Sequence, residues 1–546
     1  MERLKKLKIA LLEIRNSVTI YKFTLGIHYL TSVLREDGYT VSEMLFEAEE
    51  VDSISEMILE KDPDVVGISF YRETEEYIFK LARLLKKAKP NIKVFLGGHT
   101  ATLYSTYILK KEKNIDIVVN SEGEKTVLDL VNRLEEGRSL ETCEGITYRQ
   151  DDEIIKNKNR ELIENLDELP FPAIDVLKEK SLNNNYVFAG ISTSRGCMGK
   201  CAFCVANRFY TYEKKYNWRG RSPANVVDEI LYLKKSFPDK RLFYTIIDSS
   251  IEDPDPIRKN RLKELVSLME KNNIHIPFNC YTRSESWSEN DIDLIKRLKN
   301  VGLFEVNIGY EGSIEKTLEI FKKRASIDDN YRAYRIFKDE NINVFGFLIM
   351  FHPYTSFTEL RSNAELLLKV EMAYHPQSWW QTMDLWPDSR IFFDVTKDGL
   401  LMGPEEKGYI FNYAYEDGRI HRVNAAMKKI GESQESIAYV NTNEKIKLDQ
   451  LLYNVWKEQD SQLKVIENEM SEYIELYEQR KKLMGICQYE YFMELIDKTE
   501  RDLSDREIDS ICNDWISALR ENNIELEKIW LKFNMMFRRK KVELLV

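Results

Sequence analysis

Three cysteines stand within eight positions of this chain, in the segment SRGCMGKCAFC. Cys197, Cys201 and Cys204 have the spacing C-x3-C-x2-C. Three thiolates in one loop hold three irons of a cubane cluster and leave its fourth iron without a protein ligand. An open iron binds a substrate or a cofactor. The spacing therefore predicts a [4Fe-4S] cluster with one open coordination position.

Zinc and a chance group of buried thiols are the alternatives for this segment. Structural zinc is normally held by four ligands, and no histidine or fourth cysteine lies near at the usual spacing. A chance group does not explain a glycine-rich loop that also contains Arg195 and Lys200. Seven cysteines in 546 residues are too few for a disulfide scaffold, so metal binding in a reducing compartment is the interpretation we favour.

The composition is typical of a soluble globular protein, with 43% hydrophobic and 31% charged residues. At roughly 150 residues per domain, the length predicts three or four domains. A formal net charge of −11 offers no positive field to a phosphate backbone, so we expect no nucleic-acid partner. The sequence contains no run of about 20 apolar residues and no signal-peptide pattern, which predicts a cytoplasmic protein without membrane contact.

The elements that must position the cysteine loop begin with an α/β region. Residues 1–140 alternate short apolar runs with amphipathic stretches, as in an open, mainly parallel sheet with helices on both faces. Ligands of such sheets bind at the carboxyl ends of the strands. Ser69, Gly97-Gly98 and residues 121–124 occupy those ends. Glycine lets the backbone approach a large flat or phosphorylated ligand, and tight strand-to-helix turns are the alternative.

The rest of the chain divides into three further parts. Residues 141–185 contain two prolines and no clear period, so we expect a linker. Repeated βα units over 186–400 indicate a full or partial (β/α) barrel, with its active site at the C-terminal ends of the strands. Residues 401–546 predict a mostly helical accessory domain that closes the barrel mouth and sets specificity. Within the barrel, strands are expected from residue 186 and at 242–248, 276–282, 303–311, 342–351 and 377–387.

The cysteine loop resembles that of the radical SAM superfamily, in which an aromatic residue, here Phe203, precedes the third cysteine. The resemblance implies that the open iron chelates the amino and carboxylate groups of S-adenosylmethionine (SAM). One electron from the reduced cluster then cleaves SAM to a 5'-deoxyadenosyl radical. It also implies an external electron donor such as flavodoxin or ferredoxin.

Further segments extend this resemblance. The segment WRGRSP at 218–223 looks like the one that follows the cluster loop in many members. Asp248 stands where the family's second strand approaches the SAM amino group, and Glu311 ends a strand that resembles the fourth. Helix capping and solvated strand ends are the alternatives for both. The segment 345–360 resembles the fifth strand, but Phe351 and His352 replace small residues, which leaves the adenine contacts there open.

An α/β domain ahead of such a barrel resembles the cobalamin-binding domain of the cobalamin-dependent radical SAM group. The histidine signature D-x-H-x-x-G is absent after the first strand, so we expect cobalamin without a lower histidine ligand from that motif. His99 is expected to cap the following helix, and Tyr71 or Arg72 to lie near the lower face of the corrin. The expected cobalamin contacts are Ser69, Tyr71, Arg72, Gly97, Gly98, Glu122 and Gly123.

Methylthiotransferases also place an α/β domain before a radical SAM barrel, but they hold a second cluster with three cysteines in that domain. The first 140 residues here contain no cysteine, and Cys143 alone cannot supply that cluster. The sequence therefore argues against methylthiotransfer.

The resemblance implies methylation of an sp3 carbon in a small natural product or peptide, with methylcobalamin as the methyl donor. The first alternative is a cyclisation, ring contraction or rearrangement without methyl transfer. The second is a cobalamin or redox sensor. No catalytic side chain is assigned. Four aromatic residues near the predicted strand ends line either a substrate pocket or the core: Tyr354, Trp379, Trp380 and Trp386.

Overall fold

The structure is a computed structural model that describes residues 6–15, 25–47, 51–206, 218–387, 389–457, 461–501, 504–540 and 542. The chain divides into two compact units. The first unit comprises Met1–Met198 and Val205–Ile276, and the second comprises Gly199–Cys204 and Pro277–Val546. Among the described residues, no helix is both long and apolar enough to cross a membrane.

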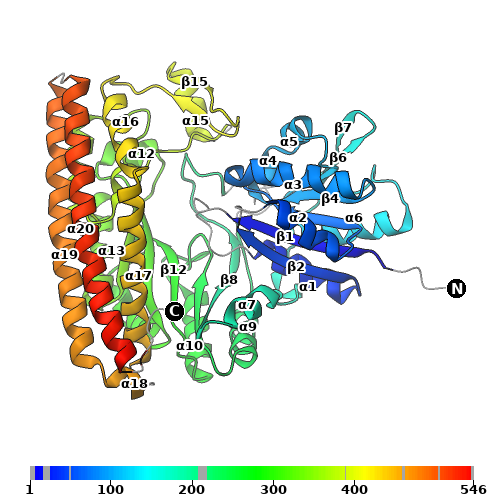
Figure 1. The fold of residues 1–546 in the computed structure, drawn as a ribbon, viewed down its shortest axis with the longest axis horizontal. Coiled ribbons are helices and arrows are strands. Elements are labelled where there is room, and N and C mark those ends of the chain that lie inside the picture. Colours follow the sequence, from blue (N-terminus) through cyan, green and yellow to red (C-terminus); the bar gives the residue numbers. More distant parts are fainter. Residues whose placement is uncertain are drawn as a thin grey trace. The chain divides into compact units, whose positions relative to one another are not determined.

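The first unit contains a seven-stranded sheet in the order β2-β1-β3-β4-β5-β6-β7 (Figure 1). Strands β1 to β5 pair in parallel, and β6 and β7 continue the sheet in antiparallel pairs. The strands are β1 (Lys8–Arg15), β2 (Thr40–Glu47), β3 (Val65–Ser69), β4 (Lys93–Gly97), β5 (Ile117–Val119), β6 (Ile146–Gln150) and β7 (Glu153–Lys156). The helices are α1 (Gly26–Glu36), α2 (Val51–Glu60), α3 (Glu75–Ala88), α4 (His99–Leu103), α5 (Ser105–Lys111), α6 (Glu124–Glu136) and α7 (Asp175–Ser181).

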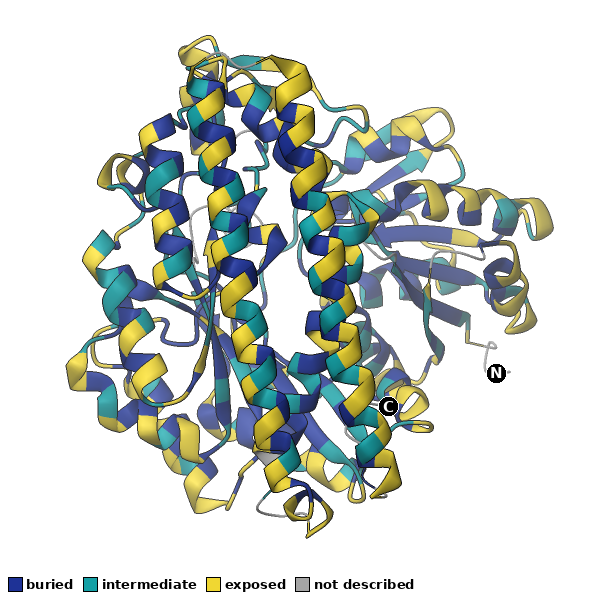
Figure 2. Ribbon diagram, turned by 60° about the vertical axis from the view of Figure 1, so that its left-hand side comes forward, coloured by how far each residue is buried: buried dark blue, intermediate teal, exposed yellow. Residues whose placement is uncertain are grey.

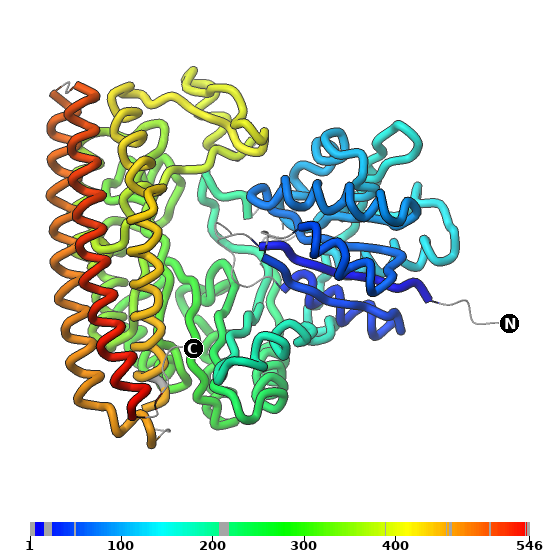
Figure 3. Tube along the Cα trace, in the orientation of Figure 1, coloured from blue at the N-terminus to red at the C-terminus, as the bar shows by residue number. Residues whose placement is uncertain are grey.

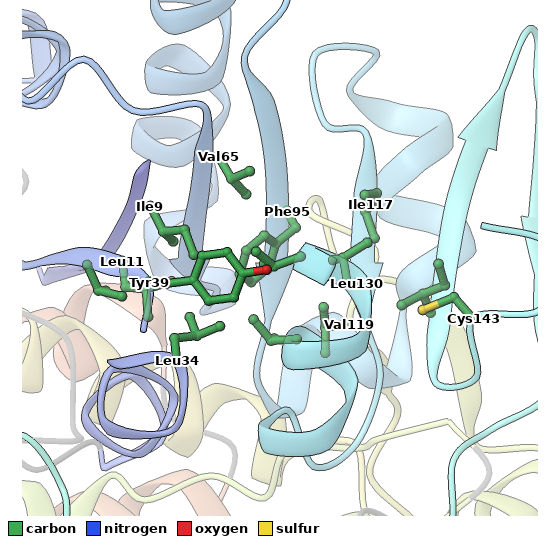
Figure 4. Close-up of a cluster of buried hydrophobic side chains, with 14 of the residues drawn as sticks. Ile9, Leu11, Leu34, Tyr39, Val65, Phe95, Ile117, Val119, Leu130 and Cys143 are labelled. Carbon is green, nitrogen blue, oxygen red and sulfur yellow. The ribbon is translucent and has the colours of Figure 1, made fainter. Parts of the chain in front are cut away.

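This sheet forms because its central strands are mostly apolar and buried. In β1, six successive residues are buried, which is the pattern of a parallel strand covered by helices on both faces. Gly67 lets neighbouring strands pack closely, because a Cβ there would lie 2.2 Å from the ring of Phe95 and 2.7 Å from Leu11. Figure 4 shows Leu11 and Phe95 in the resulting core, beside Leu34 and Leu130 of the covering helices.

Part of the expected linker is regular structure. Strands β6 and β7 lie within 141–185 and form a hairpin that extends the first sheet. The turn between them contains Asp151 with a φ of +54°. Strands of five and four residues are too short to show a clear apolar alternation in the sequence, so the hairpin could not be recognised there.

The first unit also contains the beginning of the second α/β region. Strands β8 (Tyr186–Ile191) and β11 (Arg241–Ile246) pair in parallel. Between them, β9 (Ser194–Gly196) and β10 (Trp218–Gly220) form an antiparallel pair with Arg195 opposite Arg219. Helices α9 (Pro223–Ser236) and α10 (Asn260–Lys271) follow. The βα order expected from residue 186 is therefore present.

The second unit continues the βα order with three parallel strands in the order β12-β13-β14. The strands are β12 (Phe278–Arg283), β13 (Leu303–Glu311) and β14 (Asn343–Leu348). The helices are α11 (Ile292–Asn300), α12 (Glu315–Ile320), α13 (Ile327–Asp339) and α14 (Phe357–Lys369).

The prediction of a strand at 377–387 is wrong. Pro376–Trp379 form a single 3-10 turn, and Thr382 and Leu385 make only isolated bridges. Three of the apolar residues that suggested a strand are tryptophans, of which Trp379 is in the core and Trp380 and Trp386 are partly buried. Trp379 is fully buried against Phe492 and Trp515.

The C-terminal part is mostly helical, as expected, with one small exception. Helices α17, α19 and α20 pack against one another and run side by side (Figure 3). Each carries both buried and exposed residues (Figure 2). A short hairpin, β15 (Leu401–Pro404) with β16 (Phe411–Tyr413), was not expected. The helices are α15 (Arg390–Lys397), α16 (Ile420–Gly431), α17 (Gln434–Trp456), α18 (Ser461–Lys464), α19 (Glu467–Glu500) and α20 (Asp505–Arg539).

Candidate cofactor sites

The cysteine loop begins directly after β9. Gly196 ends that strand with a φ of +91°, a conformation that favours glycine, and Cys197 follows. In the first unit, the backbone N–H of Met198 donates to Asp253 Oδ2 at 2.9 Å. In the second unit, the N–H of Cys204 donates to the carbonyl of Cys201 at 3.3 Å and closes a turn. All three cysteines are partly exposed.

The residues between the second and third cysteine are fixed by an aromatic contact. The N–H of Ala202 donates to the carbonyl of Phe321 at 2.7 Å. The rings of Phe203 and Phe321 meet edge to face, with centroids 5.1 Å apart. Phe203 therefore anchors this part of the loop within the second unit.

Asp248 follows β11 and is only 3% exposed. Its Oδ1 accepts from the backbone N–H groups of Thr193 and Ser194, at 2.8 and 3.0 Å. Its Oδ2 accepts from the hydroxyls of the same two residues. Burial raises the pKa of Asp248 against the lowering effect of these donors. Because four donors use the lone pairs of both oxygens, Asp248 holds the segment that leads to Cys197 and has no acceptor left for the SAM amino group.

Glu311 ends β13 in a different environment. Its φ of +65° is unusual for a residue other than glycine, and the register between β13 and β14 shifts at this point. The side chain folds back over Gly309, where a Cβ would lie 2.3 Å from Glu311 Oε1. Lys323 Nζ lies 3.5 Å from the same oxygen. Burial raises the pKa of Glu311, and Lys323 opposes this effect.

The residues that depart from the fifth-strand pattern are in the core. Phe351 and His352 are fully buried. His352 Nε2 lies 2.9 Å from Glu359 Oε1, which also accepts from the Thr317 hydroxyl at 2.5 Å. The bulky side chains therefore contribute to packing at the end of β14.

The ends of β3 and β4 supply the residues expected to contact cobalamin. Ser69 and Gly97 are paired in register, and the N–H of Phe70 donates to the carbonyl of Gly97 at 2.9 Å. A Cβ on Gly97 would meet no atom within 4 Å, so the backbone borders open space there. Gly98 has a φ of +106°. Tyr71 and Arg72 follow β3 and are partly exposed, and Arg72 Nε contacts Glu73 at 2.8 Å.

Glu122 and Gly123 lie in the turn from β5 to α6, and the structure gives Glu122 a role that we did not expect. Glu122 Oε1 accepts from Arg195 Nη1 at 2.9 Å and Arg219 Nη2 at 2.8 Å. Its Oε2 accepts from Arg219 Nη1 at 3.0 Å and from the N–H of Ile163 at 2.7 Å. The two carboxylate oxygens are saturated within the protein. Gly123 packs against Leu30, which lies 3.1 Å from the position of a Cβ.

One other expectation is corrected, and one open alternative is decided. His99 is the first residue of α4, and the capping position belongs to Gly98, so His99 is not the cap. Trp379 is core, as described above, and Trp380 packs on Gly431, whose Cβ would lie 2.5 Å from the indole. The Tyr354 hydroxyl donates to Asp398 at 2.8 Å, and Trp386 is partly buried. Residues 16–24, where the histidine signature is absent, lie outside the described residues.

Two known protein families match the two α/β regions of the chain. The B12 binding domain family matches residues 14–131, and the radical SAM superfamily matches residues 191–367. The chain is a cobalamin-dependent radical SAM enzyme. Its cofactors are a [4Fe-4S] cluster, SAM and cobalamin.

This radical SAM enzyme is similar in sequence to two other proteins. A methyltransferase of Pyrococcus horikoshii, itself uncharacterized, is 26% identical over 64% of this chain and 74% of its own length. The anaerobic magnesium-protoporphyrin IX monomethyl ester cyclase of Rubrivivax gelatinosus is 28% identical over 67% of this chain and 65% of its own length. In fold, the chain is similar to the cobalamin-dependent SAM radical enzyme OxsB. That match has a TM-score of 0.66 and 18% identity, and it covers 98% of this chain and 80% of OxsB.

The residues of this radical SAM enzyme fit its cofactors in chemical type. Among the described residues, no three His, Cys, Asp or Glu side chains surround one point closely enough to hold a single metal ion. A cubane does not require this, because each of three cysteines binds a different iron. On the cobalamin side, the open space beside Gly97 and the left-handed Gly98 suit close approach of a large ligand.

Proposed function

We propose that this enzyme methylates an unactivated sp3 carbon of a small natural product or a peptide. The observation that carries the proposal is the combination of a three-cysteine radical SAM loop with a B12-binding domain whose residues 14–131 contain no cysteine. The similarity to a methyltransferase supports the same outcome.

We assign the cofactors to the following residues. Cys197, Cys201 and Cys204 hold the cluster, with Phe203 fixing the loop. Glu311 contacts SAM, because it is the carboxylate at a strand end that keeps acceptor capacity. Asp248 holds Thr193 and Ser194, in the segment that leads to Cys197. The ends of β3 and β4, with the turn before α6, contact cobalamin through Ser69, Tyr71, Arg72, Gly97, Gly98 and Gly123.

When bound, the cluster and SAM supply a 5'-deoxyadenosyl radical, and methylcobalamin supplies the methyl group. The chain supplies binding, orientation and the exclusion of water. Lys323 Nζ, 3.5 Å from Glu311, favours the ionised carboxylate against the burial that raises its pKa, and an ionised carboxylate accepts from an amino group. An external electron donor such as flavodoxin or ferredoxin completes the reaction.

The substrate contacts the exposed face of β12 and β14 in this proposal. Tyr281 and Phe347 are 38% and 42% exposed, and their rings stack with centroids 6.1 Å apart at 17°. Large aromatic side chains left exposed on adjacent parts of a sheet favour contact with a flat apolar group. Phe347→Ala should raise KM for the substrate about tenfold, with SAM affinity unchanged, because one ring contact is lost.

The test compares the wild-type enzyme with Cys201→Ala after anaerobic reconstitution. We expect iron and the cluster absorbance to be lost in the variant while corrin stays bound, because the two cofactors have separate ligands. With a substrate in hand, a product heavier by one methylene per turnover supports methylation. Binding of iron without any affinity for corrin would overturn the proposal.

A second candidate is a cobalamin-bound cyclase or rearrangement catalyst without methyl transfer. The similarity to the anaerobic cyclase favours it. It predicts a product of unchanged mass, or one that has lost two hydrogens, together with 5'-deoxyadenosine. Product mass therefore separates the two functions.

A further inference from the structure

The carboxylate of Glu122 joins two parts of the first unit that are far apart in sequence. It lies within residues 14–131, which match the B12 binding domain family. Its partners Arg195 and Arg219 lie on β9 and β10, which flank the cysteine loop. Arg195 and Arg219 face each other across this strand pair.

The contact is directional as well as attractive. Both terminal nitrogens of Arg219 bind Glu122, at 2.8 and 3.0 Å, in the two-pronged arrangement of a guanidinium on a carboxylate. Arg195 divides its two terminal nitrogens between Glu122 at 2.9 Å and Glu124 at 2.5 Å. Such paired hydrogen bonds fix an angle as well as a distance.

The surroundings of this group keep it rigid. The side chains of Glu122, Arg195 and Arg219 are 5%, 12% and 4% exposed. The guanidinium of Arg195 also lies 5.3 Å from the centre of the Tyr29 ring, which belongs to helix α1. The carboxylates of Glu122 and Glu124 thus face the two guanidinium groups.

We infer that Glu122 is a positioning residue, which fixes the strand that ends beside Cys197 to the cobalamin-binding domain and thereby fixes the separation of the cluster from the corrin. Arg195 is two residues before Cys197, so a rotation of β9 is passed directly to the first cluster ligand. The inference rests on the proposed assignment of the cluster to the three cysteines. The requirement for a fixed geometry comes from the chemistry, since two cofactors must act on one substrate atom.

The test is pulsed electron paramagnetic resonance on enzyme reconstituted with both cofactors. The distance distribution between the reduced cluster and cob(II)alamin is measured for wild type, Glu122→Gln and Arg219→Lys. Arg219→Lys keeps the charge but loses the two-pronged contact. The matched control is Glu112→Gln, which alters a 3% exposed carboxylate of the same domain, paired with Arg83 and distant in sequence from the cysteine loop.

We expect both Glu122→Gln and Arg219→Lys to bind iron and corrin while the distance distribution broadens about twofold, and Glu112→Gln to match wild type. In Glu122→Gln and Arg219→Lys, formation of 5'-deoxyadenosine per molecule of product should rise on the order of tenfold. The 5'-deoxyadenosyl radical still forms in these variants, but fewer radicals lead to product. A wild-type distribution in either fully loaded variant would overturn the inference. Failure of the wild-type enzyme to bind one cofactor would instead remove the proposed function, and this inference with it.

Discussion

Carboxylates near the expected cofactor sites of the two units are used in different ways. In the first unit, Asp248 and Glu122 each accept four hydrogen bonds from the protein. In the second unit, Glu311 ends a strand in a left-handed conformation, and Lys323 contacts it at 3.5 Å. A saturated carboxylate holds the chain's own loops, whereas one with acceptor capacity at a strand end remains available to a ligand. The number of donors around the group decides its role.

The largest effect on stability is expected for Glu122→Gln. Removing this charge leaves the buried Arg219 guanidinium uncompensated and leaves Arg195 with Glu124 alone, which costs about 3–5 kcal/mol of the free energy of unfolding. The effect should depend on pH. Burial raises the pKa of Glu122, but Arg219 and Arg195 outweigh it and hold the pKa below 4.5. Because the pKa of Glu122 is lower in the folded chain than in the unfolded chain, ionised Glu122 stabilises the fold at a pH above its unfolded-state pKa. This stabilisation is lost as the pH falls through the folded-state pKa.

Urea denaturation of wild type and variant at pH 7 and near pH 4 measures this difference. The gap between the two proteins should be largest at pH 7 and shrink on acidification. Glu112→Gln provides the comparison: its partner Arg83 is 60% exposed and can turn to water when the charge is removed, so the loss should be smaller, about 2 kcal/mol. A gap that grows at acid pH would show that the pair does not stabilise the folded state.

A somewhat smaller loss is expected for Asp248→Asn. The amide keeps one acceptor oxygen, but its NH2 group faces hydroxyl and N–H donors, so about 3 kcal/mol is lost. Since Thr193 and Ser194 lead directly to Cys197, the iron content after reconstitution should fall as well. Thr193→Ala, which removes one of the four donors, should cost about 1 kcal/mol. Full iron content in Asp248→Asn would show that the loop does not need this anchor.

The sequence was sufficient for the parallel strands and the cofactors, because both leave local signals. The apolar run at 8–14 became β1, and the cysteine spacing requires only eight residues. The role of Glu122 could not be predicted, because Arg195 and Arg219 are 73 and 97 residues away. The acidic turn EGE and the basic segments SRG and WRG are visible in the sequence, but charge alone does not specify pairing over such distances.

Burial was similarly beyond local reasoning. Trp379 was one of four aromatic residues open to either a pocket or the core. Its surroundings depend on α19 and α20, more than 100 residues later, which supply Phe492 and Trp515. The saturation of Asp248 also needed the structure, because its donors precede it by more than 50 residues.

The last variant, Glu311→Gln, should have a specific effect on binding beside its effect on stability. Its contact with Lys323 is long at 3.5 Å, but Lys323 is only 4% exposed and loses its charged partner, so the variant should lose about 2 kcal/mol of folding free energy. If Glu311 accepts from the SAM amino group, the loss of a charged acceptor weakens binding by roughly 1.5 kcal/mol, or about tenfold in Kd. Calorimetric titration of SAM into reconstituted enzyme measures this directly.

The matched variant in the same unit is Glu359→Gln. Glu359 is 1% exposed and its Oε1 is already engaged by His352 and Thr317, so it serves the packing of the chain itself. Its substitution should lower stability by about 2 kcal/mol and leave the Kd for SAM unchanged. The two variants therefore separate ligand binding from folding. If Glu311→Gln binds SAM as wild type does, the available acceptor at the end of β13 serves another ligand, and the distinction between the two classes of carboxylate would not extend to SAM.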